Sequence, residues 1–101
     1  MSDKRSHERF AIELEVVLVH DGQEHAGVTR DLGMGGMFVT SDARIPFGAE
    51  LEVRLTIAAL KGATTIPATV RWHGPGGMGV QWKSLRARQV WALNRLFGRG
   101  P

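Results

Sequence analysis

Apolar and polar residues alternate along most of the chain, and this period of two is typical of half-buried β-strands. The clearest case is residues 50–57, where Leu51, Val53, Leu55 and Ile57 are separated by polar side chains. Six segments rich in apolar residues are predicted to be strands: residues 10–19, 26–32, 36–40, 50–57, 65–72 and 78–82.

The first predicted strand, residues 10–19, places Ile12 and Leu14 on the same inward face as Val16. The segment that follows it, residues 20–25, contains an Asp-Gly pair. Asp-Gly between two strand-like segments favours a tight turn, so a β-hairpin is predicted there.

The period changes near the C-terminus, where residues 84–98 carry apolar side chains along one helical face. Ser84 is the expected N-cap of this helix, and Gly98 is expected to end it. Six short strands and one terminal helix predict a small, mainly β domain, either a barrel or a sandwich. We expect a single domain over residues 10–98, preceded by a flexible arm, residues 1–9, which has little apolar surface to bury.

The composition is that of an ordinary soluble globular domain, with 101 residues, 43% of them hydrophobic and 23% charged. No apolar segment approaches the roughly 18 residues that a membrane helix needs, so no membrane insertion is expected. There is no cysteine, which agrees with a cytoplasmic location. The net charge of +3 favours an anionic partner.

Residue types that carry catalysis show no recognisable arrangement. The chain has no cysteine and no tyrosine, and its serines lie in no nucleophile-elbow motif. His20 and His25 flank the predicted hairpin turn together with Asp21 and Glu24, but their spacing matches no metal-ligand motif and is typical of a solvated polar turn. We therefore expect no enzymatic activity, no metal site and no cofactor.

Two short motifs carry the functional information. KRSHER places Arg5 and Arg9 four residues apart, and DLGMGG places Asp31 ahead of Gly33 and Gly36. Each motif alone is common, because basic arms are usually solvated and glycine-rich turns occur often by chance. Together and in this order they resemble the PilZ family, whose signature is R-x-x-x-R followed downstream by [D/N]-x-S-x-x-G. The later segments GMFV, IPFGAELEVRL, ATVRW and GMGVQW also resemble PilZ strands.

This resemblance implies a six-stranded antiparallel PilZ-type β-barrel with a C-terminal α-helix. It also implies cyclic di-GMP, a bacterial second messenger, as the ligand. In such a site Arg5 and Arg9 would pair with phosphate oxygens or guanine, since a guanidinium forms two parallel hydrogen bonds and stacks on purines. Asp31 would accept hydrogen bonds from the N1–H and N2–H donors of guanine. Gly33 and Gly36 would let the backbone approach the flat base closely.

Two positions leave alternatives open. Gly33 stands where the family usually has serine, so one hydrogen bond is expected to be missing. A weakened receptor is then expected, and Gly33→Ser should tighten binding about two- to tenfold. Trp72 shares the alternation of Ile66, Ala68 and Val70, which favours the core. In some relatives, however, an aromatic residue at this position forms a wall of the ligand site.

The resemblance favours a bacterial adaptor that binds cyclic di-GMP and relays its level to an effector protein, in motility or exopolysaccharide control. The alternative is a divergent PilZ domain that binds little or no cyclic di-GMP and acts through protein contacts. The presence of both Arg5 and Arg9 favours the receptor. Nucleic-acid binding is disfavoured by the small net charge and by the lack of an expected aromatic platform. We expect a monomer or a weak dimer.

Overall fold

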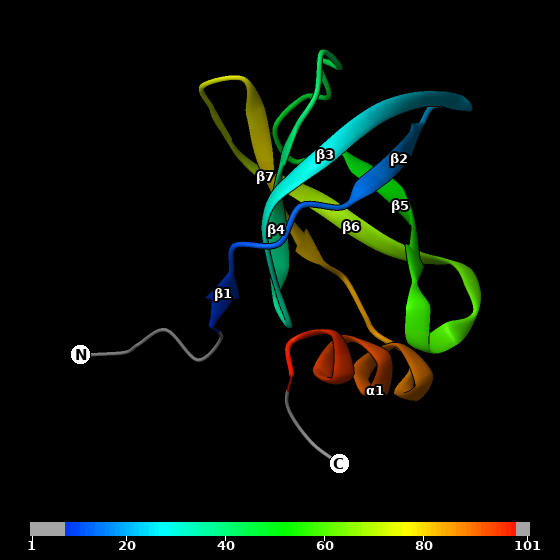
Figure 1. Cartoon of the computed structure of the whole chain (residues 1–101). Helices are drawn as coiled ribbons and strands as arrows, with labels where there is room; N and C mark the ends of the chain where they lie inside the picture. The colour runs from blue at the N-terminus through cyan, green and yellow to red at the C-terminus, as the bar shows by residue number, and fades with distance from the viewer. Residues whose placement is uncertain (1–7, 99–101) are drawn as a thin grey trace.

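Six antiparallel strands close into a barrel in the computed structural model, which describes residues 8–98 (Figure 1). They are β2 (Glu15–His20), β3 (Gln23–Gly33), β4 (Gly36–Thr40), β5 (Glu50–Ile57), β6 (Gly62–Gly74) and β7 (Gly77–Trp82). Their order around the barrel is β3-β2-β5-β6-β7-β4, and pairing between β3 and β4 closes the ring. The predicted barrel is thereby confirmed.

Three short elements complete the fold. Strand β1 (Arg9–Phe10) pairs with the end of β3 outside the closed ring. A 3-10 turn, η1 (Ala58–Leu60), joins β5 to β6, and α1 (Ala87–Leu96) follows β7. Among residues 8–98, no helix is both long enough and apolar enough to span a membrane.

The barrel core is built by the alternation that the sequence shows most clearly in β5. All four apolar residues of that strand are buried, and Val53 lies opposite Ile66 of β6. Full burial of one such side chain contributes about 1.5–3 kcal/mol. The core also takes side chains from every other strand of the ring, among them Leu18, Leu32, Val39, Ala68 and Val80.

The β2–β3 hairpin turns at Asp21 and Gly22, as predicted. Both residues have positive φ, 52° and 76°, which a type I′ turn requires. Beyond the turn, β3 continues for eleven residues. This length carries the far end of β3 past β2, to the place where β1 pairs with it.

The single first strand predicted from the sequence is wrong, because a loop separates β1 from β2. The buried Thr29 side chain of β3 holds this loop: its hydroxyl donates to Ile12 O at 2.6 Å and accepts from Leu14 N at 2.8 Å. The Thr29 amide also donates to Leu14 O at 2.9 Å. Thr29 thus satisfies backbone groups of the loop, and Ile12 and Leu14 are only partly buried.

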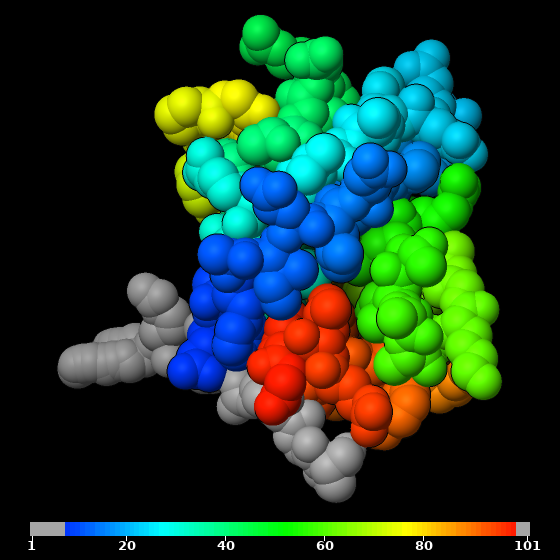
Figure 2. Space-filling model, in the orientation of Figure 1, coloured from blue at the N-terminus to red at the C-terminus, as the bar shows by residue number. Residues whose placement is uncertain are grey.

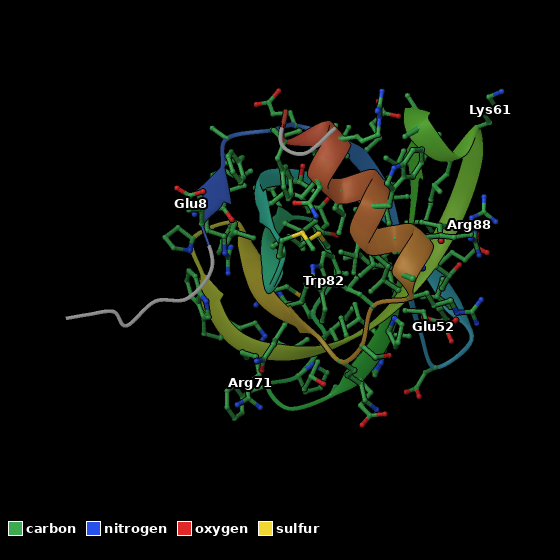
Figure 3. The ribbon with its side chains drawn as sticks, turned by 90° about the horizontal axis from the view of Figure 1, so that it is seen from below. Glu8, Glu52, Lys61, Arg71, Trp82 and Arg88 are labelled. Carbon is green, nitrogen blue, oxygen red and sulfur yellow. The ribbon has the colours of Figure 1, made fainter. Side chains whose placement is uncertain are left out.

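Helix α1 lies across one mouth of the barrel, as the view from below shows (Figure 3). Its Ala92 and Leu93 are fully buried and join the barrel core. The helix ends at Leu96, and Gly98, the glycine predicted to end it, follows with a φ of +75° and an amide that donates to Arg95 O at 3.0 Å. This is the usual role of a glycine that follows a helix.

The predicted N-cap at Ser84 is wrong, because the helix begins at Ala87, two residues later than an N-cap at Ser84 implies. Arg86 occupies the N-cap position, and its amide donates to the side-chain oxygen of Gln89 at 2.8 Å. The Gln89 amide nitrogen donates in turn to Thr64 Oγ1 at 2.8 Å and to Thr65 O at 3.0 Å. The start of α1 is therefore set by a buried side chain that ties the helix to β6.

Candidate functional site

Arg9 and Asp31, which lie 22 positions apart in the chain, form an ion pair. Strand β1 pairs with the last residues of β3, with Arg9 opposite Gly33. In this register Arg9 Nη1 donates a hydrogen bond to Asp31 Oδ1. Both side chains remain partly exposed, at 40% for Arg9 and 33% for Asp31. The structure thus joins one residue of each sequence motif on the outer wall of the barrel.

Arg9 was expected at the end of a flexible arm, and the structure instead places it in a strand. The next residue explains this difference, because the Phe10 ring stacks on Phe97 beyond the end of α1. The ring centroids are 4.4 Å apart and the planes differ by 14°. In the space-filling view β1 (blue) lies beside the end of α1 (red) (Figure 2). Arg5 lies outside the described residues.

Only one of the two carboxylate oxygens of Asp31 accepts hydrogen bonds from residues 8–98. Its Oδ1 accepts from Phe38 N at 3.2 Å as well as from Arg9. Its Oδ2 takes part in no hydrogen bond between residues 8–98. The carboxylate is therefore held in place through one oxygen, while the other can accept an N–H donor from a ligand.

A β-bulge explains how Asp31 reaches the outer wall. Thr29 pairs with Val39, but the next pair joins Asp31 to Phe38, so that Arg30 is an extra residue in β3. Because of this bulge, both Arg30 and Asp31 lie beside Phe38 of β4, on the wall rather than in the core.

Arg30 is the residue that sequence reasoning missed. Its guanidinium carbon lies 3.9 Å from the centroid of the Phe38 ring, and the residue is exposed. Regular alternation would place Arg30 and Asp31 on opposite faces, so the pattern concealed their common position. The adjacent Arg-Asp pair was the available indication, but a bulge could not be inferred from it.

The core interpretation of Trp72 is wrong. Its side chain is 48% exposed, because a second irregularity, between Val70 and Trp72, breaks the alternation of β6. The indole packs against Phe38, with 5.0 Å between ring centroids. Trp72 therefore lies on the same wall as Asp31 and Arg30, and its role as a wall of the ligand site stays a prediction.

Two glycines make room for this exposed indole. A Cβ at Gly79, directly across from Trp72, would lie 2.3 Å from its Nε1, and a Cβ at Gly74 would lie 2.5 Å from its Cζ3. Any larger residue at either position would displace the ring. The space left by these two glycines holds the indole over β7, with the Phe38 ring beside it.

Gly33 and Gly36 have a steric role that the sequence did not predict. Neither has positive φ, and the space beside each is filled by protein backbone. A Cβ on Gly33 would lie 2.4 Å from Glu8 O, and one on Gly36 would lie 2.0 Å from Val80 O. In this structure the two glycines permit close approach of neighbouring strands, and their contact with a ligand stays a prediction.

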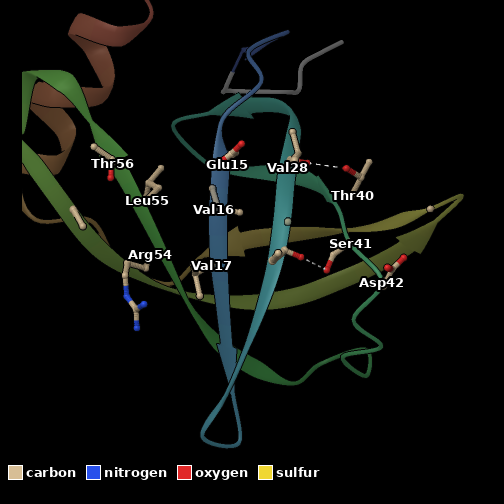
Figure 4. Close-up of a pocket in the computed structure, with 14 residues that line it drawn as sticks. Glu15, Val16, Val17, Val28, Thr40, Ser41, Asp42, Arg54, Leu55 and Thr56 are labelled. Carbon is tan, nitrogen blue, oxygen red and sulfur yellow. Dashed lines mark hydrogen bonds between the residues drawn. The ribbon is translucent and has the colours of Figure 1, made fainter.

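A hollow in the surface lies elsewhere on the barrel. It has a volume of about 740 Å³ and lies along β2, β3 and β5, where Val17, Val28 and Arg54 contribute to its lining (Figure 4). None of the predicted site residues within the described part of the chain lines it. Residues 8–98 contain no group of three His, Asp or Glu side chains able to hold a metal ion.

The fold and this wall define a small β-barrel domain that carries partly exposed charged and aromatic side chains on its outside. A family model described as PilZ domain matches residues 3–99, and the chain belongs to this family. No curated protein matches the chain at the level of sequence.

Two solved structures share the fold. The PilZ domain of CeSA from a cellulose-synthesizing bacterium is 22% identical, with a TM-score of 0.70 over 90% of this chain and 96% of that one. The Bacillus subtilis inhibitor of motility (MotI/DgrA) is 16% identical, with a TM-score of 0.71. That match covers 99% of this chain, which spans only 55% of the length of the Bacillus protein.

Proposed function

We propose that this PilZ domain is a cytoplasmic, non-enzymatic receptor for cyclic di-GMP. The ligand would bind on the outer wall, at Arg9, Asp31 and Trp72, with Arg5 joining from the preceding segment. The observation that supports this most directly is the ion pair between Arg9 and Asp31, which unites the two PilZ motifs.

The chemistry of the wall suits this ligand. Cyclic di-GMP carries two phosphates and two guanines, so it needs cations, acceptors for N–H groups and stacking surfaces. Arg9 and Arg30 supply guanidinium groups, which bind phosphate and the O6 and N7 atoms of guanine. The open Oδ2 of Asp31 can accept from the guanine Watson–Crick edge, and the exposed indole of Trp72 offers a flat face.

The proposed output is a relay to an effector protein. Binding would change the surface that the domain presents, and a partner would respond to that change. One of the two solved relatives is named an inhibitor of motility, and the other comes from a cellulose-synthesizing bacterium. These names fit an output in motility or exopolysaccharide control, by a monomer or weak dimer without a cofactor.

Calorimetric titration of the full chain with cyclic di-GMP tests the receptor hypothesis. We expect saturable binding that Arg9→Ala weakens roughly tenfold to over a hundredfold, because a charge-assisted contact contributes about 1.5–3 kcal/mol. Cyclic di-AMP should bind much more weakly, since adenine lacks the N1–H and N2–H donors that Asp31 would accept.

Arg88→Ala is the matched control for Arg9→Ala. Arg88 is an exposed arginine of α1, and Figure 3 shows it far from Glu8 and the neighbouring β1. Its removal lowers the net charge equally and should leave the affinity unchanged. Equal losses in both variants would mean that only overall charge attracts the ligand.

A domain that acts through protein contacts alone is the second candidate. One observation favours it: Gly33 lacks the hydroxyl of the usual serine. Absence of any binding heat with the wild-type chain, at concentrations up to the millimolar range, would support this candidate and refute the receptor.

A further inference from the structure

Gly33 lies directly beneath β1, where the N-terminal segment crosses the end of β3. Arg9 is its cross-strand partner. A Cβ on Gly33 would lie 2.4 Å from Glu8 O and 3.1 Å from Arg9 Cδ. A contact of 2.4 Å with a backbone oxygen is not relieved by a side-chain rotation. Any residue other than glycine therefore requires a backbone movement here.

The end of β3 is held from the other side, so β1 is the part that has to move. The indole Nε1 of Trp82 donates to Gly33 O at 3.0 Å, and the Trp82 amide donates to Gly35 O at 2.9 Å. Trp82 is itself buried in the barrel core. By contrast β1 is two residues long, pairs with β3 alone among the strands of residues 8–98, and follows the exposed Glu8.

We propose that Gly33 is a positioning residue for Arg9. Because Gly33 has no side chain, β1 can lie on β3 and hold the Arg9 guanidinium against Asp31 before any ligand arrives. This inference rests on the proposed function for its consequence in binding, but the placement of β1 can be measured without ligand. It reverses the expectation from the sequence that Gly33→Ser tightens binding.

The expected effect on affinity follows from the population of the docked arm. If only a fraction of the molecules has β1 in place, the apparent Kd rises by the inverse of that fraction. A serine that leaves β1 docked in about a tenth to a fifth of the molecules would weaken binding about five- to tenfold. The serine hydroxyl could recover part of this loss only by contacting the ligand itself.

Gly33→Ser is tested against Gly62→Ser. Gly62 also lies in a strand and lacks positive φ, but a Cβ there meets no atom within 4 Å. In the ligand-free proteins we expect faster hydrogen exchange at the amides of Arg9 and Phe10 in Gly33→Ser, with the barrel amides unchanged. Gly62→Ser should exchange like the wild type.

Titration with cyclic di-GMP then separates positioning from a general loss of structure. Gly33→Ser should weaken binding about five- to tenfold in the wild-type background and less than about twofold when Arg9 is already alanine. A serine that only damaged the fold would cost the same affinity in both backgrounds. Unchanged β1 exchange, equal losses in both backgrounds, or tighter binding by Gly33→Ser would each overturn the inference.

Phe10→Ala keeps the test decisive if Gly33→Ser does not fold. This variant removes the ring that stacks on Phe97 and leaves Gly33, Arg9 and Asp31 intact. It should also speed exchange at β1 and weaken binding. Loosened β1 with full affinity would refute the positioning role. If the wild type binds no cyclic di-GMP, the receptor proposal fails, and the exchange data alone decide whether Gly33 positions Arg9.

Discussion

Two walls of the same barrel are constructed in opposite ways. Along β5, and from Ile66 to Val70 in β6, every second residue is apolar and buried, and the pairing runs without a shift from Glu50 to Ile57. The wall around Asp31 contains two irregularities, one at Arg30 in β3 and one between Val70 and Trp72 in β6. The first wall supplies core side chains, and the second presents polar and aromatic groups outward.

The difference shows how one barrel combines an apolar core with an exposed wall of polar and aromatic side chains. In a regular strand, each residue turned outward is flanked by residues turned inward. A bulge adds a residue and re-aims the side chains beside it. The two irregularities found in the strands of residues 8–98 direct side chains onto the same ring, because Arg30 and Trp72 each contact Phe38.

Mutations in the regular wall, formed by β5 and β6, should change the stability of the fold more than ligand binding. Ile66→Ala removes a fully buried side chain opposite Val53 and should lower the free energy of unfolding by about 2–5 kcal/mol. Urea unfolding measures this change. The affinity of the folded variant for cyclic di-GMP should stay within about twofold of wild type. A large loss of affinity in fully folded protein would contradict the division of roles between the two walls.

Mutations in the irregular wall, around Asp31 and Trp72, should change the affinity for cyclic di-GMP. Trp72→Ala should weaken cyclic di-GMP binding by about 1–3 kcal/mol, since stacking on an aromatic side chain contributes this much per base. Trp91→Ala is the matched control, because Trp91 of α1 is 49% exposed and Trp72 is 48% exposed. Calorimetry on both variants compares them directly. Equal affinities for the two would place the ligand away from Trp72.

The smallest effect is expected at Arg30. Arg30→Ala leaves Arg9 and Asp31 in place and removes a guanidinium that no carboxylate pairs with among residues 8–98. Binding should weaken about two- to tenfold, and Arg30→Lys should restore only part of it, because lysine lacks the planar group. Titrations at two salt concentrations would test the charge contribution. If Arg30→Ala binds with wild-type affinity, Arg30 does not contribute to the ligand site.

Much of the fold was predictable because its rules are local. Strict alternation identified β5, an Asp-Gly pair identified the β2–β3 turn, and Gly98 marked the end of α1. Each of these features depends on residues close together in the chain. The two site motifs were also visible, since Arg9 and Asp31 belong to short patterns that the family shares.

What tertiary structure decided depends on residues far apart in the chain. The amide of Gln89, held by β6, moved the start of α1 away from Ser84, and the hydroxyl of Thr29 separated β1 from β2. The irregularity between Val70 and Trp72 turns the Trp72 side chain outward, and Gly79 on the neighbouring strand leaves space for its indole. Gly33 shows most clearly what the sequence alone could not predict. The sequence suggests a missing serine hydroxyl, whereas the structure shows that β1 lies too close for a Cβ at this position. The space beside Gly33 is set by the backbone of Glu8, which is distant in the chain.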